Sequence, residues 1–85
     1  MTIREEALQV LCDKAAKLFG LDEAKKAALS RDTEFVKDLN CTSVNFVQMS
    51  AALEDEFEIE INFQVIINWK NFGEACDYVA GELGE

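Results

Sequence analysis

The stretch Asp38–Val47, which reads DLNCTSVNFV, marks the point where a polar loop ends and a helix begins. Thr42 is a good helix N-cap, because its side-chain oxygen can accept a hydrogen bond from a backbone N–H of the first turn. Ser43 then lies where unpaired N–H groups and the positive end of the helix dipole converge, which favours a phosphate group. A serine at this position either carries a phosphodiester or simply begins the helix.

Apolar residues at spacings of three and four predict three main helices. The first runs from about residue 3 to 19, with Thr2 as its N-cap and Gly20 placed to end it. The second is expected from about Ser43 to Phe57. The third begins after Asn71, a residue that can cap it.

The segment 21–41 forms a long first loop, in which residues 22–29 can add a short helical turn. Three apolar side chains in this otherwise polar segment, those of Phe35, Val36 and Leu39, are expected to hold the loop against the core. A loop this long in a small domain is typical of a functional segment.

Residues 58–63 alternate as a strand does, but no second strand is predicted to pair with them. An extended connector is therefore expected, followed by one short helical turn over 64–68 and by Trp69 in the core. The predicted fold is all-α: a small antiparallel bundle of three main helices plus one short helix, with a long first loop. The whole chain, residues 1–85, is expected to be one domain.

The helix predicted for residues 43–57 carries two apolar stripes, although a surface helix needs only one. Phe46, Met49, Leu53 and Phe57 form the expected core face. The opposite side mixes small apolar groups with carboxylates: Val44, Val47, Ala51, Glu54, Asp55 and Glu58. This second stripe either docks a partner or meets another part of the bundle.

Charge and composition exclude several functions. The net charge of −9 argues against nucleic-acid binding and favours partners with basic surfaces. The chain has no histidine, which removes Ser–His and Cys–His nucleophilic pairs and histidine metal sites, so neither catalysis nor a metal is expected.

Its three cysteines are widely spaced, which favours reduced thiols in the cytoplasm. No apolar run is long enough to span a membrane, and no signal peptide is recognisable.

From Asp32 to Val79 the sequence resembles acyl carrier proteins. That family has Phe-x-x-Asp-Leu-Gly-x-Asp-Ser-Leu and then Ala-Leu-Glu-Glu-Glu-Phe-x-Ile-x-Ile, where this chain reads FVKDLNCTSV at 35–44 and ALEDEFEIEI at 52–61. Asn40 replaces the family's Gly, Thr42 its Asp and Val44 its Leu. Because Thr42 replaces an aspartate, the negative charge beside the serine is absent. This difference affects which phosphopantetheinyl transferase recognises the site.

The resemblance implies that 4′-phosphopantetheine is attached covalently to Ser43 by a phosphopantetheinyl transferase. The arm would hold acyl intermediates as thioesters in fatty acid or related acyl-chain biosynthesis. The chain would then be a non-catalytic, monomeric carrier that docks acyl-transfer and chain-elongation enzymes with basic surfaces. The implied docking residues are Thr42, Val44, Val47, Ala51, Glu54, Asp55 and Glu58.

Two alternatives stay open. One is a specialised carrier for polyketide, aminoacyl, D-alanyl or unusual lipid chemistry, which is suggested by Thr42, Val44 and Trp69. In having tryptophan at position 69, the chain resembles D-alanine carrier proteins. An unmodified acidic adaptor that only binds proteins is the other alternative. In a carrier, four small residues could leave room for an acyl chain between the helices: Ala51, Ala52, Ala75 and Cys76.

Overall fold

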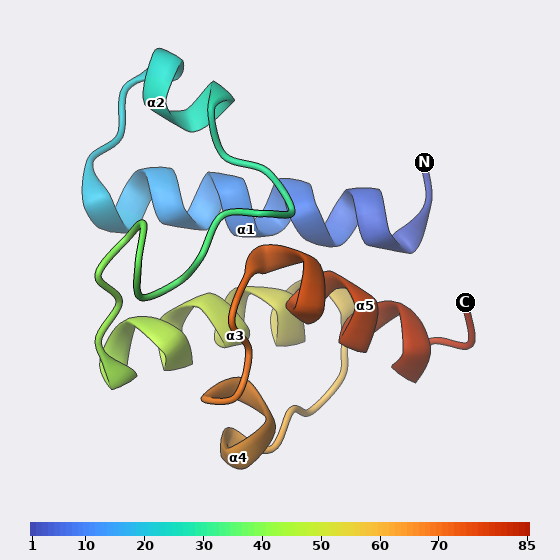
Figure 1. Ribbon diagram of the computed structural model, residues 1–85. Helices are drawn as coiled ribbons and strands as arrows, with labels where there is room; N and C mark the ends of the chain where they lie inside the picture. Colours follow the sequence, from blue (N-terminus) through green and yellow to red (C-terminus); the bar gives the residue numbers. More distant parts are fainter.

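The computed structural model describes all residues, 1–85, and contains five helices and no sheet (Figure 1). The helices are α1 (Ile3–Phe19), α2 (Glu23–Ala27), α3 (Ser43–Phe57), α4 (Phe63–Ile66) and α5 (Phe72–Glu82). In Figure 1, α1 runs opposite to α3 and α5, and it packs against both. The prediction of an all-α bundle is confirmed, and the turn expected within the first loop is a fifth helix, α2.

The ends of the main helices follow local hydrogen-bond chemistry. At the start of α1, the Thr2 hydroxyl accepts from Glu5 N at 3.1 Å, and Thr2 N donates to the Glu5 carboxylate at 3.0 Å. Gly20 ends the helix with φ at 62°, a left-handed conformation that costs glycine nothing. At α5, Asn71 accepts from Glu74 N at 2.9 Å. The predicted caps of α1 and α5 are therefore confirmed.

The core is organised around a residue from the first loop. The fully buried ring of Phe35 lies 4.9 Å from that of Phe46, 5.0 Å from that of Phe72 and 6.3 Å from that of Trp69, measured between centroids. The loop thus contributes the side chain that joins α3 to α5. The predicted core residues of α3 are also confirmed, since Phe46, Met49 and Leu53 are buried, and Phe57 is partly buried.

Backbone hydrogen bonds hold the first loop against the segment that precedes α5. Phe35 N donates to Lys70 O at 3.0 Å, and Phe72 N donates to Thr33 O at 2.9 Å. The expectation that Val36 also holds the loop is wrong, because this side chain is 60% exposed. The backbone turns tightly here, with Asn40 N donating to Val36 O at 2.9 Å, so neighbouring side chains in this turn cannot all face the core.

No helix has both the length and the apolar character needed to cross a membrane.

Asp77 on α5 joins two distant arginines. Its carboxylate accepts from Arg4 Nε at 2.9 Å and from a terminal guanidinium nitrogen of Arg31 at 3.0 Å. Hydrogen bonding to Arg31, and then to Arg4, lowers the pKa of Asp77 from its ordinary value of 3.8. Because the pKa is lower in the folded than in the unfolded state, the pairs stabilise the fold above about pH 4, and this contribution is lost as the pH falls through the folded pKa.

We expect Asp77→Asn to lower the free energy of unfolding at pH 7 by up to about 1 kcal/mol, since both ion pairs are solvent-exposed. The difference from the wild type should shrink below about pH 3 and in 1 M salt. Urea unfolding at a series of pH values measures this. Asp32→Asn is the matched control, since Asp32 is exposed and forms no ion pair. Equal stability of the two variants at pH 7 would contradict the prediction.

Candidate functional site

Ser43 is the first residue of α3, and a closed set of hydrogen bonds holds the turn before it. The Thr42 hydroxyl oxygen accepts from Asn45 N at 3.3 Å, while Asn45 Oδ1 accepts from Thr42 N at 2.9 Å. Asn45 Nδ2 also donates to the Gln48 side-chain oxygen at 3.2 Å. The predicted N-cap is confirmed. Asn45 is an additional member that the sequence pattern did not reveal, because glutamate or glutamine is usual at this position of a capping box.

The surroundings of Ser43 suit a phosphate group. The Ser43 side chain is exposed, and its hydroxyl forms no hydrogen bond within the chain. The backbone N–H groups of Ser43 and Val44 precede the first helical hydrogen bond, which Phe46 N makes to Thr42 O at 3.0 Å, so both remain available. A phosphate on the serine oxygen would meet these donors and the positive end of the helix dipole.

The first turn of α3 differs in charge from that of the other two long helices. α1 and α5 each have glutamate in the first turn, Glu5 and Glu74 among them, whereas α3 has no acidic residue there. In α1 and α5 a side-chain carboxylate already compensates the helix dipole. In α3 this end stays positive, and no neighbouring carboxylate in the turn repels an incoming phosphate.

The loop residues before Thr42 are fixed to the core. Asn40 has φ at 53°, the left-handed conformation that the family's glycine would adopt freely and that asparagine tolerates. Cys41 N donates to Phe35 O at 2.9 Å, and the Cys41 side chain is buried. Burial raises the pKa of the Cys41 thiol to about 11, so this thiol is protonated at neutral pH and does not compete with Ser43 as a nucleophile.

The structure places most of the predicted docking residues on one exposed side of α3. Val44 is 63% and Val47 46% exposed, so the alternative that they pack against the rest of the bundle is wrong. Thr42, Ala51, Asp55 and Glu58 are also exposed. Glu54 is only half-exposed, because its carboxylate accepts from Ile61 N at 3.0 Å and so holds the connector after α3.

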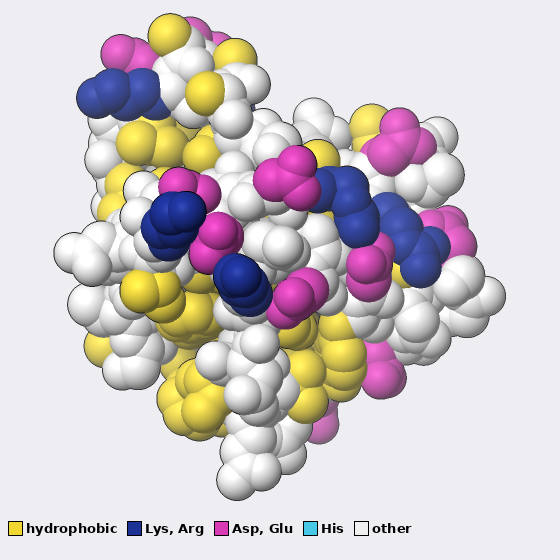
Figure 2. All heavy atoms as spheres, in the orientation of Figure 1, with side chains coloured by type: hydrophobic (Ala, Val, Ile, Leu, Met, Phe, Trp, Pro, Cys, Tyr) yellow, Lys and Arg dark blue, Asp and Glu magenta, His cyan; other side chains and the backbone are white.

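Further exposed apolar side chains lie on the neighbouring short helix. Phe63 is 47% exposed and Ile67, just after the end of α4, is 46% exposed. In Figure 2, hydrophobic side chains gather on the lower part of the molecule, where α3 and α4 lie, below a band of charged groups. The sequence pattern did not reveal these two residues, although their spacing of four places them on one side of a helical turn.

Comparisons with known proteins agree with this geometry. Residues 9–79 match the protein family described as phosphopantetheine attachment site. The chain is 31% identical over 75 residues to the acyl carrier protein of Lactobacillus johnsonii, which covers 88% of this chain and 90% of that protein. It is 42% identical over 52 residues to the mitochondrial acyl carrier protein of Saccharomyces cerevisiae, 61% of this chain but only 42% of the yeast protein.

A solved structure has the same fold. The acyl carrier protein from Enterococcus faecalis superposes with a TM-score of 0.73 at 28% sequence identity, over 95% of this chain and 98% of that chain. The fold and the matched family define a phosphopantetheine-binding carrier. The chain belongs to the acyl carrier protein family. It is a carrier of acyl chains with covalently bound 4′-phosphopantetheine, as its sequence predicted.

Proposed function

We propose that Ser43 is the attachment residue and that residues 1–85 act as one non-catalytic carrier domain. The observation that supports Ser43 most directly is its exposed, unbonded hydroxyl at the N-terminus of α3, where the first turn has no acidic residue. Thr42 and Asn45 support the attachment by fixing the turn that presents this hydroxyl.

Loading requires coenzyme A and a phosphopantetheinyl transferase. The Ser43 hydroxyl gives its proton to a base of the transferase, and its oxygen bonds to the phosphorus next to pantetheine. The pyrophosphate bond of coenzyme A breaks, and adenosine 3′,5′-bisphosphate leaves. The N–H groups of Ser43 and Val44 then stabilise the charge of the new phosphodiester. The thiol at the end of the arm supplies the thioester chemistry.

Intact mass measures this loading. The chain is incubated with coenzyme A, magnesium and a broad-specificity phosphopantetheinyl transferase, beside a carrier that this transferase is known to modify. We expect a mass increase equal to one phosphopantetheine. If the control carrier gains the arm and this chain does not, the attachment by a common transferase is disproved.

The charge distribution along α3 indicates what kind of surface a partner enzyme needs in order to bind this helix. Apolar and neutral groups surround the Ser43 end, while Asp55 and Glu58 lie at the other end. From Ser43 to Asp55 the helix rises about 18 Å. A matching acyl-transfer or chain-elongation enzyme has an apolar hollow at its active-site entrance and arginine or lysine side chains at that distance. The basic groups speed the encounter, and the apolar contact sets the lifetime of the complex.

Val47→Asp tests this docking face. A charge in the middle of the apolar contact should lower kcat/KM for loading by the transferase about tenfold, which corresponds to about 1.4 kcal/mol. The fold should not change, because Val47 is 46% exposed. Leu83→Asp is the matched control, an exposed apolar residue just beyond α5. Wild-type loading kinetics for both variants would exclude this side of α3 as the docking face.

We infer fatty acid biosynthesis as the pathway and the cytoplasm as the location. The named relatives are acyl carrier proteins, and three unpaired thiols, Cys12, Cys41 and Cys76, are typical of a reducing compartment. Trp69 was one of the residues that pointed to a specialised D-alanyl carrier. Packing accounts for this residue, since it is buried with its ring centroid 5.9 Å from that of Tyr78.

A further inference from the structure

The two longest uncharged stretches of the chain lie next to each other in the fold. Residues 39–53 and 61–69 have no charged side chain, in a chain with eight basic and 17 acidic residues among 85. The first stretch includes most of α3, the second includes α4, and α4 packs against α3 (Figure 1). Their exposed large apolar side chains are those of Val44, Val47, Phe63 and Ile67. Two helices therefore form one uncharged surface, which begins at Ser43.

The segment that joins these two stretches is the most acidic in the chain. It reads EDEFEIE at 54–60, with five carboxylates whose mutual repulsion favours an extended connector that lies away from α3. Glu54 instead holds the connector at the end of the helix. Its backbone oxygen accepts from Glu58 N and, at 3.3 Å, from Ile59 N, and its carboxylate accepts from Ile61 N at 3.0 Å. One residue thus binds three backbone N–H groups on the way to α4.

The bond from Ile61 N to the Glu54 carboxylate fixes the chain just before α4. Asn62 caps α4 and Phe63 is its first residue, so the bonded N–H lies two residues before the helix. With only four residues, α4 is too short to be stable by itself, and its position depends on the segments that flank it. Within α4 only Ile66 is buried. Together with Ile66, the carboxylate of Glu54 therefore orients α4 beside α3.

We infer that Glu54 is a positioning residue for docking, which rests on the proposed attachment at Ser43. Its carboxylate holds α4 so that both helices present their apolar side chains to the enzyme that acts on Ser43. Glu54 itself does not pair with a basic group of that enzyme, because its half-exposed carboxylate is already directed at Ile61 N. The exposed carboxylates of Asp55 and Glu58 stay free for such pairs. The enzyme therefore needs an apolar hollow that is wide enough for both α3 and α4.

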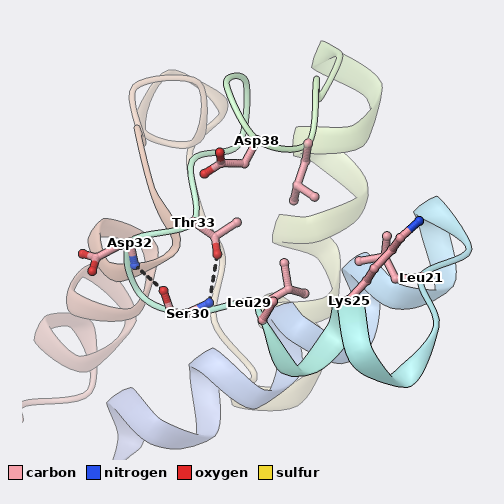
Figure 3. A pocket seen from close by; sticks show the side chains of 9 residues that line it. Leu21, Lys25, Leu29, Ser30, Asp32, Thr33 and Asp38 are labelled. Carbon is pink, nitrogen blue, oxygen red and sulfur yellow. Dashed lines mark hydrogen bonds between the residues drawn. The ribbon is translucent and has the colours of Figure 1, made fainter.

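The surface beside α2 does not offer the same contact. A hollow of about 450 Å³ lies there, between α2 and the loop that leads to α3 (Figure 3). Its apolar lining is recessed and comes from three half-buried leucines, Leu21, Leu29 and Leu39. Three charged side chains also line it, those of Lys25, Asp32 and Asp38. An apolar partner surface placed here would take water away from these charges, which is unfavourable.

The main helices leave no apolar opening between them either. Of the four small residues that could leave room there, Ala75 and Cys76 are fully buried in the packed core, and Ala51 faces solvent. Ala52 lines a hollow whose other walls are mostly charged. The exposed apolar groups of α3 and α4 are therefore the ones that a partner enzyme can cover.

Three variants that each remove one negative charge separate positioning from charge pairing in loading by the transferase. Glu54→Ala removes the acceptor of Ile61 N, Glu54→Gln keeps an oxygen acceptor, and Glu56→Ala is the matched control, an exposed carboxylate of α3 without a hydrogen bond. We expect Glu54→Ala to raise the KM for the carrier roughly fivefold with kcat unchanged, because an apolar contact away from the reacting oxygen is lost. Glu54→Gln and Glu56→Ala should stay within about twofold of the wild type.

Ile67→Asp shows whether Glu54 acts through α4. A charge on this exposed residue just beyond α4 should raise the same KM about tenfold. In a Glu54→Ala background it should add little, because α4 is no longer held in the docking face, so the two effects are far from additive. Independent effects that multiply would show that Glu54 does not act through α4 and would overturn the inference.

Amide hydrogen exchange, measured on the unloaded chain, reports on the bond itself. Ile61 N–H should exchange faster in Glu54→Ala but not in Glu54→Gln. Intact mass establishes wild-type loading first, so a failure there concerns the attachment at Ser43 and not the role of Glu54. The inference is overturned if Glu54→Gln raises the KM as much as Glu54→Ala, or if a folded Glu54→Ala protein loads as the wild type does. If Glu54→Ala does not fold, a raised KM for Glu54→Gln or a wild-type KM for Ile67→Asp overturns it.

Discussion

Ser43→Ala should abolish loading completely, with no phosphopantetheine added in the time that the wild type takes to react to completion. The variant lacks the oxygen that forms the phosphodiester, and the neighbouring Thr42 hydroxyl is engaged with Asn45. The Cys41 thiol is buried with its pKa raised to about 11. The measurement is intact mass after incubation with coenzyme A and the transferase.

The variant should fold as the wild type does, because the Ser43 hydroxyl has no hydrogen bond to lose. Circular dichroism and urea unfolding check this. Ser30→Ala, another exposed serine in a turn, is the loading control and should gain one arm. An arm on the Ser43→Ala protein would disprove the attachment site. Full biological activity of Ser43→Ala would instead favour the unmodified adaptor.

Phe35→Ala should cause the largest loss of stability of any single substitution proposed for this chain. Its ring is fully buried and packs against Phe46, Phe72 and Trp69. Removal of a buried phenylalanine ring costs about 3–5 kcal/mol, through lost burial and the cavity left behind. Small domains have only about 5–15 kcal/mol in total. We therefore expect a strongly lowered urea midpoint, or a chain that is largely unfolded at 37 °C.

Loading should fall with stability, because the buried ring of Phe35 holds in place the backbone carbonyl that accepts from Cys41 N at 2.9 Å in the turn before Ser43. Phe63→Ala is the matched control. It removes the same ring from a position that is 47% exposed, and it should cost less than about 1 kcal/mol. Similar losses in the two variants would show that Phe35 does not anchor the core.

The cap residues and the serine could be predicted from the sequence because the forces that act on them are local. Thr2, Gly20 and Thr42 begin or end helices through bonds or torsion angles within a few residues, and α3 begins and ends where its pattern predicts. The sequence pattern placed Ser43 at the start of α3, and the structure has it there. The alternation of core and exposed residues in α3 also followed from helical geometry alone.

Only the tertiary structure decided which loop residues face inward and where apolar space remains. Phe35 and Val36 are adjacent and both apolar, yet one is fully buried and the other is 60% exposed. The difference comes from hydrogen bonds to the segment before α5, which is distant in the sequence. The surface hollow between α2 and the first loop, which is lined by Leu21, Leu29 and Leu39, likewise depends on how these two segments lie against each other. Caps depend on neighbours in the chain, whereas burial and hollows depend on segments that meet only after folding.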